Sequence, residues 1–126
     1  MTANNVEHAI LDSRSWDKTE ALSQLGGDEE LLQELIALFM DESSELLDGV
    51  REAIAVSDAK GIIRGAHSIK GEVSCLGAHA ASASAEQLEA MAAAKNFSGV
   101  AETFADLEGK ISALRTAFIQ FLGPRP

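Results

Sequence analysis

The sequence has little cysteine, proline and aromatic side chain, and each shortage excludes a class of structure. Among its 126 residues are one cysteine, Cys75, two prolines and no tyrosine. A single cysteine cannot form an internal disulfide or a cysteine-only metal cluster, which suits a reducing compartment. Both prolines lie in the C-terminal GPRP, so no internal helix is interrupted. The lack of tyrosine and the scarcity of β-branched runs argue against a sheet, and the chain is predicted to be all-α.

Basic residues and long apolar runs are also scarce. The formal net charge is −10, from 20 acidic and 10 basic residues, and this sign opposes binding to nucleic acid or to anionic lipid. The apolar runs are only a few residues long, whereas a membrane-spanning helix needs roughly 20 apolar residues. The opening MTANNVEHAILDSRSW lacks the basic and apolar segments of a signal peptide. We therefore expect a cytoplasmic protein with neither nucleic acid nor a membrane as a partner.

Apolar residues recur at helical period along most of the chain. The clearest stripe comprises Val100, Phe104, Leu107, Ile111, Leu114, Phe118 and Phe121. Its alternating spacing predicts a helix of about six turns. Other helices are predicted at about 17–25, 28–56, 58–76 and 78–95, with Asp28 and Asp58 as N-caps. Short connections make neighbours antiparallel, so the predicted fold is an up-down antiparallel four-helix bundle with a short accessory N-terminal helix.

The length suits a single domain. We expect the bundle to comprise residues 15–123, with a mobile segment at 1–14 and a short tail at 124–126. Each apolar stripe can be used within one bundle, which favours a monomer.

The predicted helix at 58–76 carries a histidine on its solvent face. Its inward stripe is Ile62, Ala66, Ile69, Val73 and Leu76. At about 100° per residue, this stripe turns His67 about 140° away from the core. Lys70 and Gly71 follow three and four residues later, on the same side of the surface. A glycine inside a helix costs about 1 kcal/mol relative to alanine, so Gly71 indicates that something must approach His67 closely.

This grouping has the chemistry of a phosphorylation site. A neutral imidazole has a nucleophilic ring nitrogen near neutral pH and can form covalent intermediates. Lys70 can supply a mobile positive charge for phosphoryl oxygens, while Gly71 leaves space for a partner's active site. Ser74, one turn further, can offer a hydroxyl to the same group. An ordinary surface histidine is the alternative for His67 alone, but the combined pattern favours a phosphoacceptor.

The segment AHSIKGEVSCLGA, with the pattern H-x-x-K-G-x-x-x-x-x-G, closely resembles the histidine-containing phosphotransfer (HPt) domains of two-component phosphorelays. The segments ALSQLGGDEELLQELIALFMDES and AEQLEAM extend the resemblance over about 17–122. It implies that His67 accepts a phosphoryl group from a receiver-domain aspartate and passes it to another response regulator. It also maps Lys70 and Gly71 onto the phosphate-neighbouring and clearance positions, and Gly77 onto the turn after the active helix.

The resemblance also implies partners and cofactors. The partners are the receiver domains of hybrid histidine kinases and response regulators, and the receiver supplies Mg²⁺. The chain itself is expected to need no cofactor or metal and to be a phosphocarrier without autonomous kinase activity, which agrees with its lack of a nucleotide-binding signature. The cognate partners and the direction of phosphoryl flow are left open.

A docking surface for the receiver is predicted beside His67, because even a transient complex needs a desolvated centre. The candidates are Ile63 and Arg64 on the same helix, and Leu38 and Met40 on the preceding one. The acidic outer face of the helix at 28–56 indicates either partner selection or simple solvation.

Two other functions compete with a relay. A phosphate-independent interaction module would bind a regulator without using His67, but the intact His67, Lys70 and Gly71 argue against it. A carboxylate-bridged metal enzyme needs inward-facing Glu-x-x-His pairs, and the acidic residues are instead assigned to outward faces. Cys75 and His79 have the spacing of a helical metal pair, although Gly77 is expected to end the helix between them.

Overall fold

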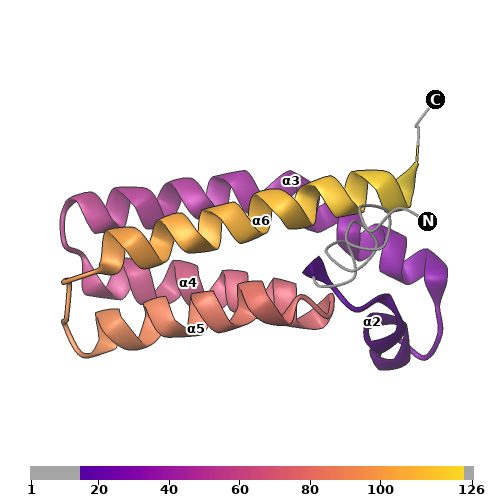
Figure 1. The fold of residues 1–126 in the computed structure, drawn as a ribbon, viewed down its shortest axis with the longest axis horizontal. Helices are drawn as coiled ribbons and strands as arrows, with labels where there is room; N and C mark the ends of the chain where they lie inside the picture. Colours follow the sequence, from indigo (N-terminus) through magenta and orange to yellow (C-terminus); the bar gives the residue numbers. More distant parts are fainter. Residues whose placement is uncertain (1–14, 124–126) are drawn as a thin grey trace, which may run out of the picture.

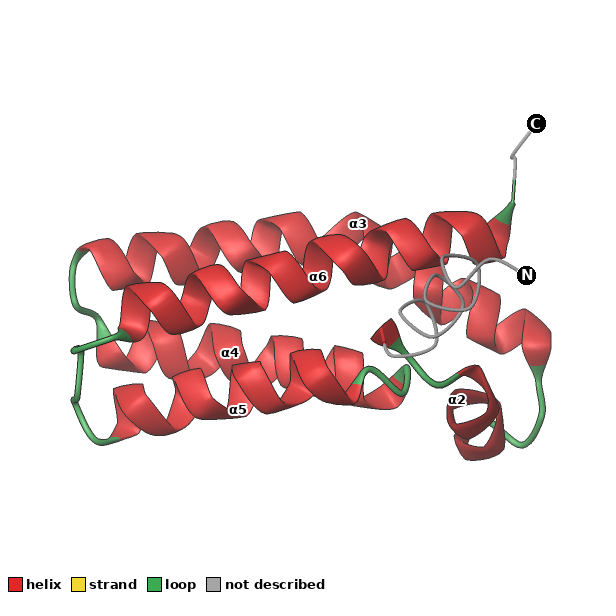
Figure 2. Cartoon of the chain, viewed as in Figure 1, coloured by secondary structure: helices red, strands yellow, loops and turns green. Residues whose placement is uncertain are grey.

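The computed structural model describes residues 15–123, which form five helices and no strand (Figures 1 and 2). The helices are α2 (Lys18–Gln24), α3 (Glu29–Ala55), α4 (Ala59–Cys75), α5 (His79–Ala93) and α6 (Val100–Leu122). The prediction of an all-α chain is confirmed for this part of the sequence. The expectations for 1–14 and 124–126 concern residues outside those described.

Aspartate residues begin three of the helices. The side chains of Asp17, Asp28 and Asp58 each accept a hydrogen bond from the backbone N–H three residues later, at 3.0, 3.0 and 3.1 Å. Each bond satisfies an amide that has no partner inside the helix and typically contributes about 1 kcal/mol. The predicted N-caps at Asp28 and Asp58 are therefore confirmed.

The four long helices lie side by side, with α3 and α6 along one side of the molecule and α4 and α5 along the other, while α2 lies at one end (Figure 1). Each long helix packs against two of the others. The predicted stripe of α4 and its C-cap is buried, and comprises Ile62, Ala66, Ile69, Val73 and Leu76. Burial of a large aliphatic side chain contributes roughly 1.5–3 kcal/mol, so this stripe fixes the rotation of α4.

Gly77 ends α4 and also contacts the start of α2. Its φ of 71° is a left-handed conformation, which glycine adopts at little cost. A Cβ at this position would lie 2.5 Å from the carbonyl oxygen of Asp17. The Asp17 N–H donates a hydrogen bond to the Gly77 carbonyl at 2.9 Å. The sequence predicts a turn here, and the structure adds a close contact between the end of α4 and the N-terminus of α2.

The first two glycines of α4 have a packing role. A Cβ on Gly65 would lie 2.4 Å from Cγ2 of Val50, and one on Gly61 would lie 2.6 Å from Oδ2 of Asp58 and 3.0 Å from Cβ of Ala53. Both glycines therefore let α3 and α4 approach closely. The sequence of α4 alone gives no reason for Gly61 and Gly65, because the contacts that explain them include residues of the facing helix α3.

One polar residue, Ser43, is buried among the apolar residues on the inward face of α3, and a neighbouring helix explains it. Ser43 is 1% exposed, and its Oγ accepts a hydrogen bond from Nη1 of Arg115 at 2.6 Å. The same nitrogen donates to the Met40 carbonyl at 2.8 Å. The buried hydroxyl thus has a partner, and α6 is tied to α3 by polar contacts as well as by apolar ones.

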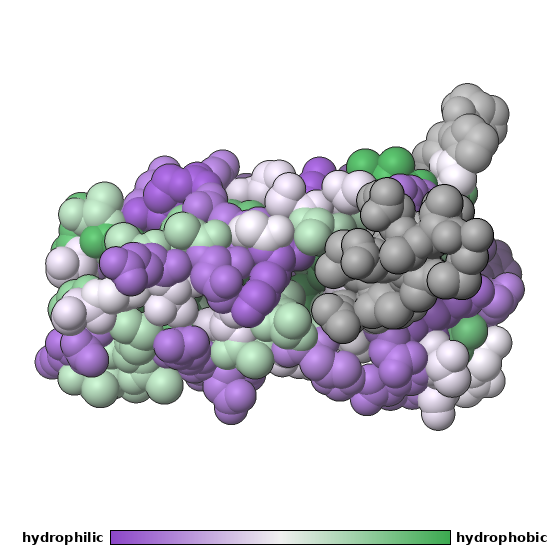
Figure 3. All heavy atoms as spheres, viewed as in Figure 1, coloured by the Kyte–Doolittle hydropathy of each residue, from purple (hydrophilic) through white to green (hydrophobic). Residues whose placement is uncertain are grey.

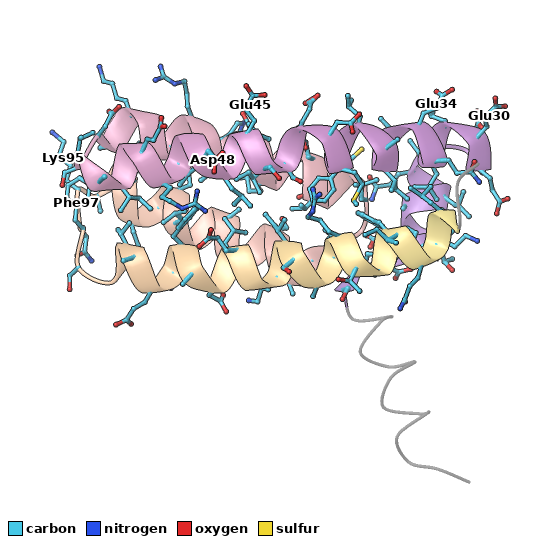
Figure 4. The ribbon with its side chains drawn as sticks, turned by 90° about the horizontal axis from the view of Figure 1, so that it is seen from above. Glu30, Glu34, Glu45, Asp48, Lys95 and Phe97 are labelled. Atoms are coloured by element: carbon cyan, nitrogen blue, oxygen red, sulfur yellow. The ribbon has the colours of Figure 1, made fainter. Side chains whose placement is uncertain are left out.

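The outer face of α3 is acidic. Glu30, Glu34 and Glu45 point away from the bundle (Figure 4), and all three are exposed.

Hydrophilic and hydrophobic residues are mixed on the face of the molecule drawn in Figure 3. Among the helices of residues 15–123, none combines the length and the apolar character that crossing a membrane requires.

Candidate functional site

His67 lies in the middle of α4 on the side that faces solvent. Its side chain is 68% exposed, as the direction of the buried stripe predicts. The imidazole is carried by a helix that is packed along its whole inward face, and not by a loop. It can therefore meet a partner without any rearrangement of the bundle.

Glu89 reaches His67 from the neighbouring helix α5. Its Oε2 lies 3.3 Å from Nδ1 of His67, and its Oε1 lies 3.1 Å from Nζ of Lys70. The Glu89 side chain is only 24% exposed. Its Oε1 is buried and has no hydrogen bond within the described residues, so the contact with Lys70 is an ion pair without hydrogen-bond alignment. One carboxylate thus faces both the imidazole and the lysine.

The position of Glu89 distinguishes the two ring nitrogens of His67. The carboxylate lies on the Nδ1 side, and a carboxylate there favours the tautomer with the proton on Nδ1. The lone pair is then on Nε2, the nitrogen that is free to attack an electrophile. Sequence reasoning missed Glu89; the available signal was that Leu88, beside it, belongs to the buried stripe of α5 and turns Glu89 toward a flank.

Lys70 and Ser74 lie on the α5 side of His67. The side chain of Lys70 is 28% exposed, because its stem is covered while its ammonium group reaches Glu89. The Oγ of Ser74 lies 2.7 Å from the Oγ of Ser82 on α5, and Ser74 is about two turns beyond His67. That Ser74 neighbours the phosphoryl group stays a prediction, and in this structure its hydroxyl contacts Ser82.

Gly71 leaves an open surface beside His67. A Cβ at this position would meet no atom within 4 Å among the described residues, its own helix backbone aside. Packing in the bundle therefore does not require a glycine here, in contrast to Gly61 and Gly65. That Gly71 leaves space for a partner beside His67 stays a prediction, with which this open surface agrees.

An apolar pocket of about 230 Å³ opens next to Gly71, between α3 and α4. It is lined by Leu35, Leu38, Phe39, Gly71, Glu72, Cys75 and Leu76. Leu38 is 51% exposed at the edge of this pocket. A partner that covered this pocket could desolvate Leu38 while facing His67.

The other predicted docking residues do not border this pocket. Arg64 lines a larger groove of about 480 Å³ with charged walls, which also contains Gly61 and Gly65. Ile63 and Met40 are half-buried and pack against the core. Of the four predicted docking residues, the structure thus brings only Leu38 beside Gly71.

Glu72 and Glu89 correct the prediction that acidic side chains lie on outward faces, because both are half-buried. Burial raises the pKa of the Glu72 carboxyl, and the negative charge of the nearby Glu42 raises it further. The Oε1 of Glu72 is buried without a hydrogen bond from the described residues. The Glu72 carboxylate at the rim of the apolar pocket is therefore destabilised in its ionised form.

Glu72→Gln is expected to stabilise the protein at neutral pH. Because the folded pKa is raised, the native state binds the Glu72 proton more tightly than the unfolded chain, and stability is lost as pH rises through the folded pKa. Glutamine avoids that loss. Since Glu72 is partly exposed, solvent screening limits the gain to about 0.5 kcal/mol.

Urea denaturation at several pH values measures this effect. The advantage of Glu72→Gln should be present at pH 7 and disappear below about pH 4, where the wild-type carboxyl is protonated in both states. Glu45→Gln, a change at an exposed residue of α3, is the control and should show no such pH dependence. An advantage that persisted at acid pH would mean that the carboxylate charge is not its cause.

Cys75 and His79, which have the spacing of a metal pair, lie in different surroundings. Cys75 lines the apolar pocket, whereas His79 contacts Glu20 of α2. Within residues 15–123, no three His, Cys, Asp or Glu side chains are grouped so that they could hold a metal ion.

The model of the Hpt domain family matches residues 34–117, more than half of the chain, including His67, Lys70 and Gly71. The chain therefore belongs to the Hpt domain family, whose members carry phosphoryl groups on histidine in phosphorelays and interact with receiver domains. A crystal structure of histidine-containing phosphotransfer protein B (HptB) from Pseudomonas aeruginosa PAO1 is similar in fold, with a TM-score of 0.78 and 24% identity, covering 84% of this chain and 92% of that chain. Comparison with curated proteins found no match.

Proposed function

We propose that this chain is a histidine phosphotransfer protein, which accepts a phosphoryl group on His67 from a receiver-domain aspartate and passes it to another response regulator. The observation that carries this proposal is an imidazole 68% exposed on a packed helix, with Lys70 and the open surface of Gly71 beside it. Membership of the Hpt family supports the same chemistry.

The transfer needs one nucleophile from this chain. The lone pair of Nε2 attacks the phosphorus of the receiver's acyl phosphate, and an N–P bond forms as the P–O bond to the aspartate breaks. The aspartate leaves as a carboxylate, and the ring loses its Nδ1 proton on the side of Glu89. Lys70 supplies positive charge for the phosphoryl oxygens. The same steps in reverse deliver the group to the next regulator.

The remaining requirements fall to the partner. The receiver supplies Mg²⁺ and the acidic pocket that holds it, so the chain needs no cofactor and acts as a phosphocarrier without autonomous kinase activity. Its partners are the receiver domains of hybrid histidine kinases and response regulators. We assign the protein to the cytoplasm, where such receivers work, and expect it to act as a monomer.

We assign this function to residues 15–123 as one domain, an up-down antiparallel four-helix bundle of α3 to α6 with α2 as an accessory helix. The packing of each long helix against two others supports the bundle. The hydrogen bond between Asp17 and Gly77, at 2.9 Å, supports α2 as an attached element.

A mass measurement on the wild-type protein tests the function. The protein is incubated with phosphorylated receiver domains and Mg²⁺, and a gain of one acid-labile phosphoryl group is expected. A folded protein that gained no phosphoryl group across a broad panel of receivers would instead be a phosphate-independent interaction module.

Leu38→Asp is expected to slow transfer about fivefold, because a charge in the apolar pocket opposes desolvation of the docking surface. The rate is measured at receiver concentrations below saturation. Ile119→Asp on α6 is the matched control, since Ile119 is an exposed aliphatic residue, 59% exposed against 51% for Leu38. Equal rates for the two variants would remove the pocket from the docking surface.

A further inference from the structure

The carboxylate of Glu89 lies where a phosphoryl group on His67 would come close to negative charge. Its Oε2 is 3.3 Å from Nδ1 of His67, and Nε2 is on the far side of the same small ring. We infer that Glu89 sets the equilibrium constant for phosphoryl transfer between His67 and a receiver aspartate. Its carboxylate destabilises phospho-His67, which makes phospho-His67 a strong phosphoryl donor to receiver aspartates. This inference rests on the proposed function and extends it to the direction of flow.

Glu89 also holds the cation that would neutralise the phosphoryl group. Nζ of Lys70 lies 3.1 Å from Oε1 of Glu89, and the two side chains are only 28% and 24% exposed. Charges that are partly buried are screened less than fully exposed ones. If Lys70 turns to a phosphoryl group, the buried Oε1, which has no hydrogen bond from the described residues, loses its counter-charge. Phosphorylation therefore disturbs an ion pair that the unphosphorylated protein keeps.

The charge balance of the transfer shows why Glu89 opposes the phosphorylated state of His67. The receiver acyl phosphate and the imidazole yield the aspartate carboxylate, an N-phosphoimidazole and one proton released to solvent. The surroundings of Glu89 thus gain about two negative charges when the phosphoryl group arrives. Repulsion by the Glu89 carboxylate and the loss of its pairing with Lys70 both oppose the phosphorylated state.

The expected size follows from Coulomb's law. A unit charge and a doubly charged phosphoryl group about 6 Å apart, in a water-like dielectric with physiological salt, shift an equilibrium constant by about threefold. Removal of the carboxylate charge should therefore raise the ratio of phosphorylated to unphosphorylated His67 about threefold when the receiver is phosphorylated to the same extent, and the shift should shrink as salt is added.

A competition experiment measures this ratio directly. Wild type and Glu89→Gln, one of them labelled with ¹⁵N so that their masses differ, are mixed with one phosphorylated receiver domain and Mg²⁺ at pH 8. Both exchange with the same receiver, so the quotient of their phosphorylated-to-unphosphorylated ratios gives the change in equilibrium constant. The ratio of phosphorylated to unphosphorylated protein is expected to be about threefold higher for the variant. A mere loss of stability would not move this quotient.

Two further variants distinguish the effect of the Glu89 carboxylate from the effect of removing any negative charge from α5. Glu86→Gln removes an exposed charge from the same helix and should leave the quotient unchanged. Glu89→Asp keeps the charge and should stay within about twofold of wild type. An unchanged quotient for Glu89→Gln, or an equal rise for Glu86→Gln, would overturn the inference alone. Wild type that takes up no phosphoryl group would overturn the proposed function, and the inference with it.

Discussion

His67→Gln is expected to abolish the gain of an acid-labile phosphoryl group completely. Glutamine has no nucleophilic ring nitrogen, and its amide cannot form the N–P bond under these conditions. The His67 side chain is 68% exposed, so the change leaves the buried stripe of α4 intact and should alter stability by no more than about 0.5 kcal/mol. Intact-protein mass after incubation with phosphorylated receivers and Mg²⁺ shows the loss, and urea denaturation confirms the fold.

His79→Gln is a closely matched control. The side chain of His79 is 67% exposed and contacts the carboxylate of Glu20, much as His67 contacts a glutamate. The residues three and four positions after it are Ser82 and Ala83, which offer neither a cation nor clearance. This variant should be phosphorylated as fully as wild type. Phosphorylation that survived in His67→Gln but vanished in His79→Gln would show that His79, and not His67, is the acceptor.

The helices and the exposure of His67 could be predicted because both depend on local information. Apolar residues at helical period mark the inward face of each helix, and Asp28 and Asp58 mark two of the N-termini through side-chain capping. Once Ile69 and its stripe point inward, the direction of His67 follows from 100° per residue. None of these steps needs the position of another helix.

Contacts between side chains of different helices could not be predicted from the sequence, because they depend on how neighbouring helices are aligned along their axes. The stripe of α5 shows that Glu89 lies on a flank, but not which turn of α4 it faces, so its contacts with His67 and Lys70 were missed. The same holds for Gly65, whose reason is the side chain of Val50 on α3. Residue spacing within one helix contains no information on that offset.

The docking surface stays a prediction, and the structure adds only which of its candidate residues share a pocket with Gly71. Leu38 lies off the inward stripe of α3, which local periodicity reveals, and the structure adds that it borders an apolar pocket together with Gly71. Ile63 is off the centre of its stripe as well, yet it packs against the core. Angular position on a helix limits which residues can be exposed, while the neighbouring helices decide which of them are.

Replacement of Gly71 is expected to make the protein more stable and less active. A Cβ here would meet no atom within 4 Å among the described residues, its own helix backbone aside, so Gly71→Ala should raise the free energy of unfolding by about 1 kcal/mol. The receiver must approach the same surface, and added side-chain atoms in a close contact typically cost about 1–3 kcal/mol. We therefore expect transfer to slow several-fold in Gly71→Ala and at least about tenfold in Gly71→Gln.

Gly109→Ala distinguishes clearance from a general effect of a stiffer helix. Gly109 lies inside α6, and a Cβ there would likewise meet no atom within 4 Å, so this variant should gain a similar stability without any change in transfer rate. A comparable slowing in Gly109→Ala would trace the loss to rigidity. Wild-type rates in both Gly71 variants would leave the glycine without a functional reason. Opposite effects on stability and on transfer at Gly71, and at Gly71 alone, would show that α4 forgoes local stability there to keep His67 accessible.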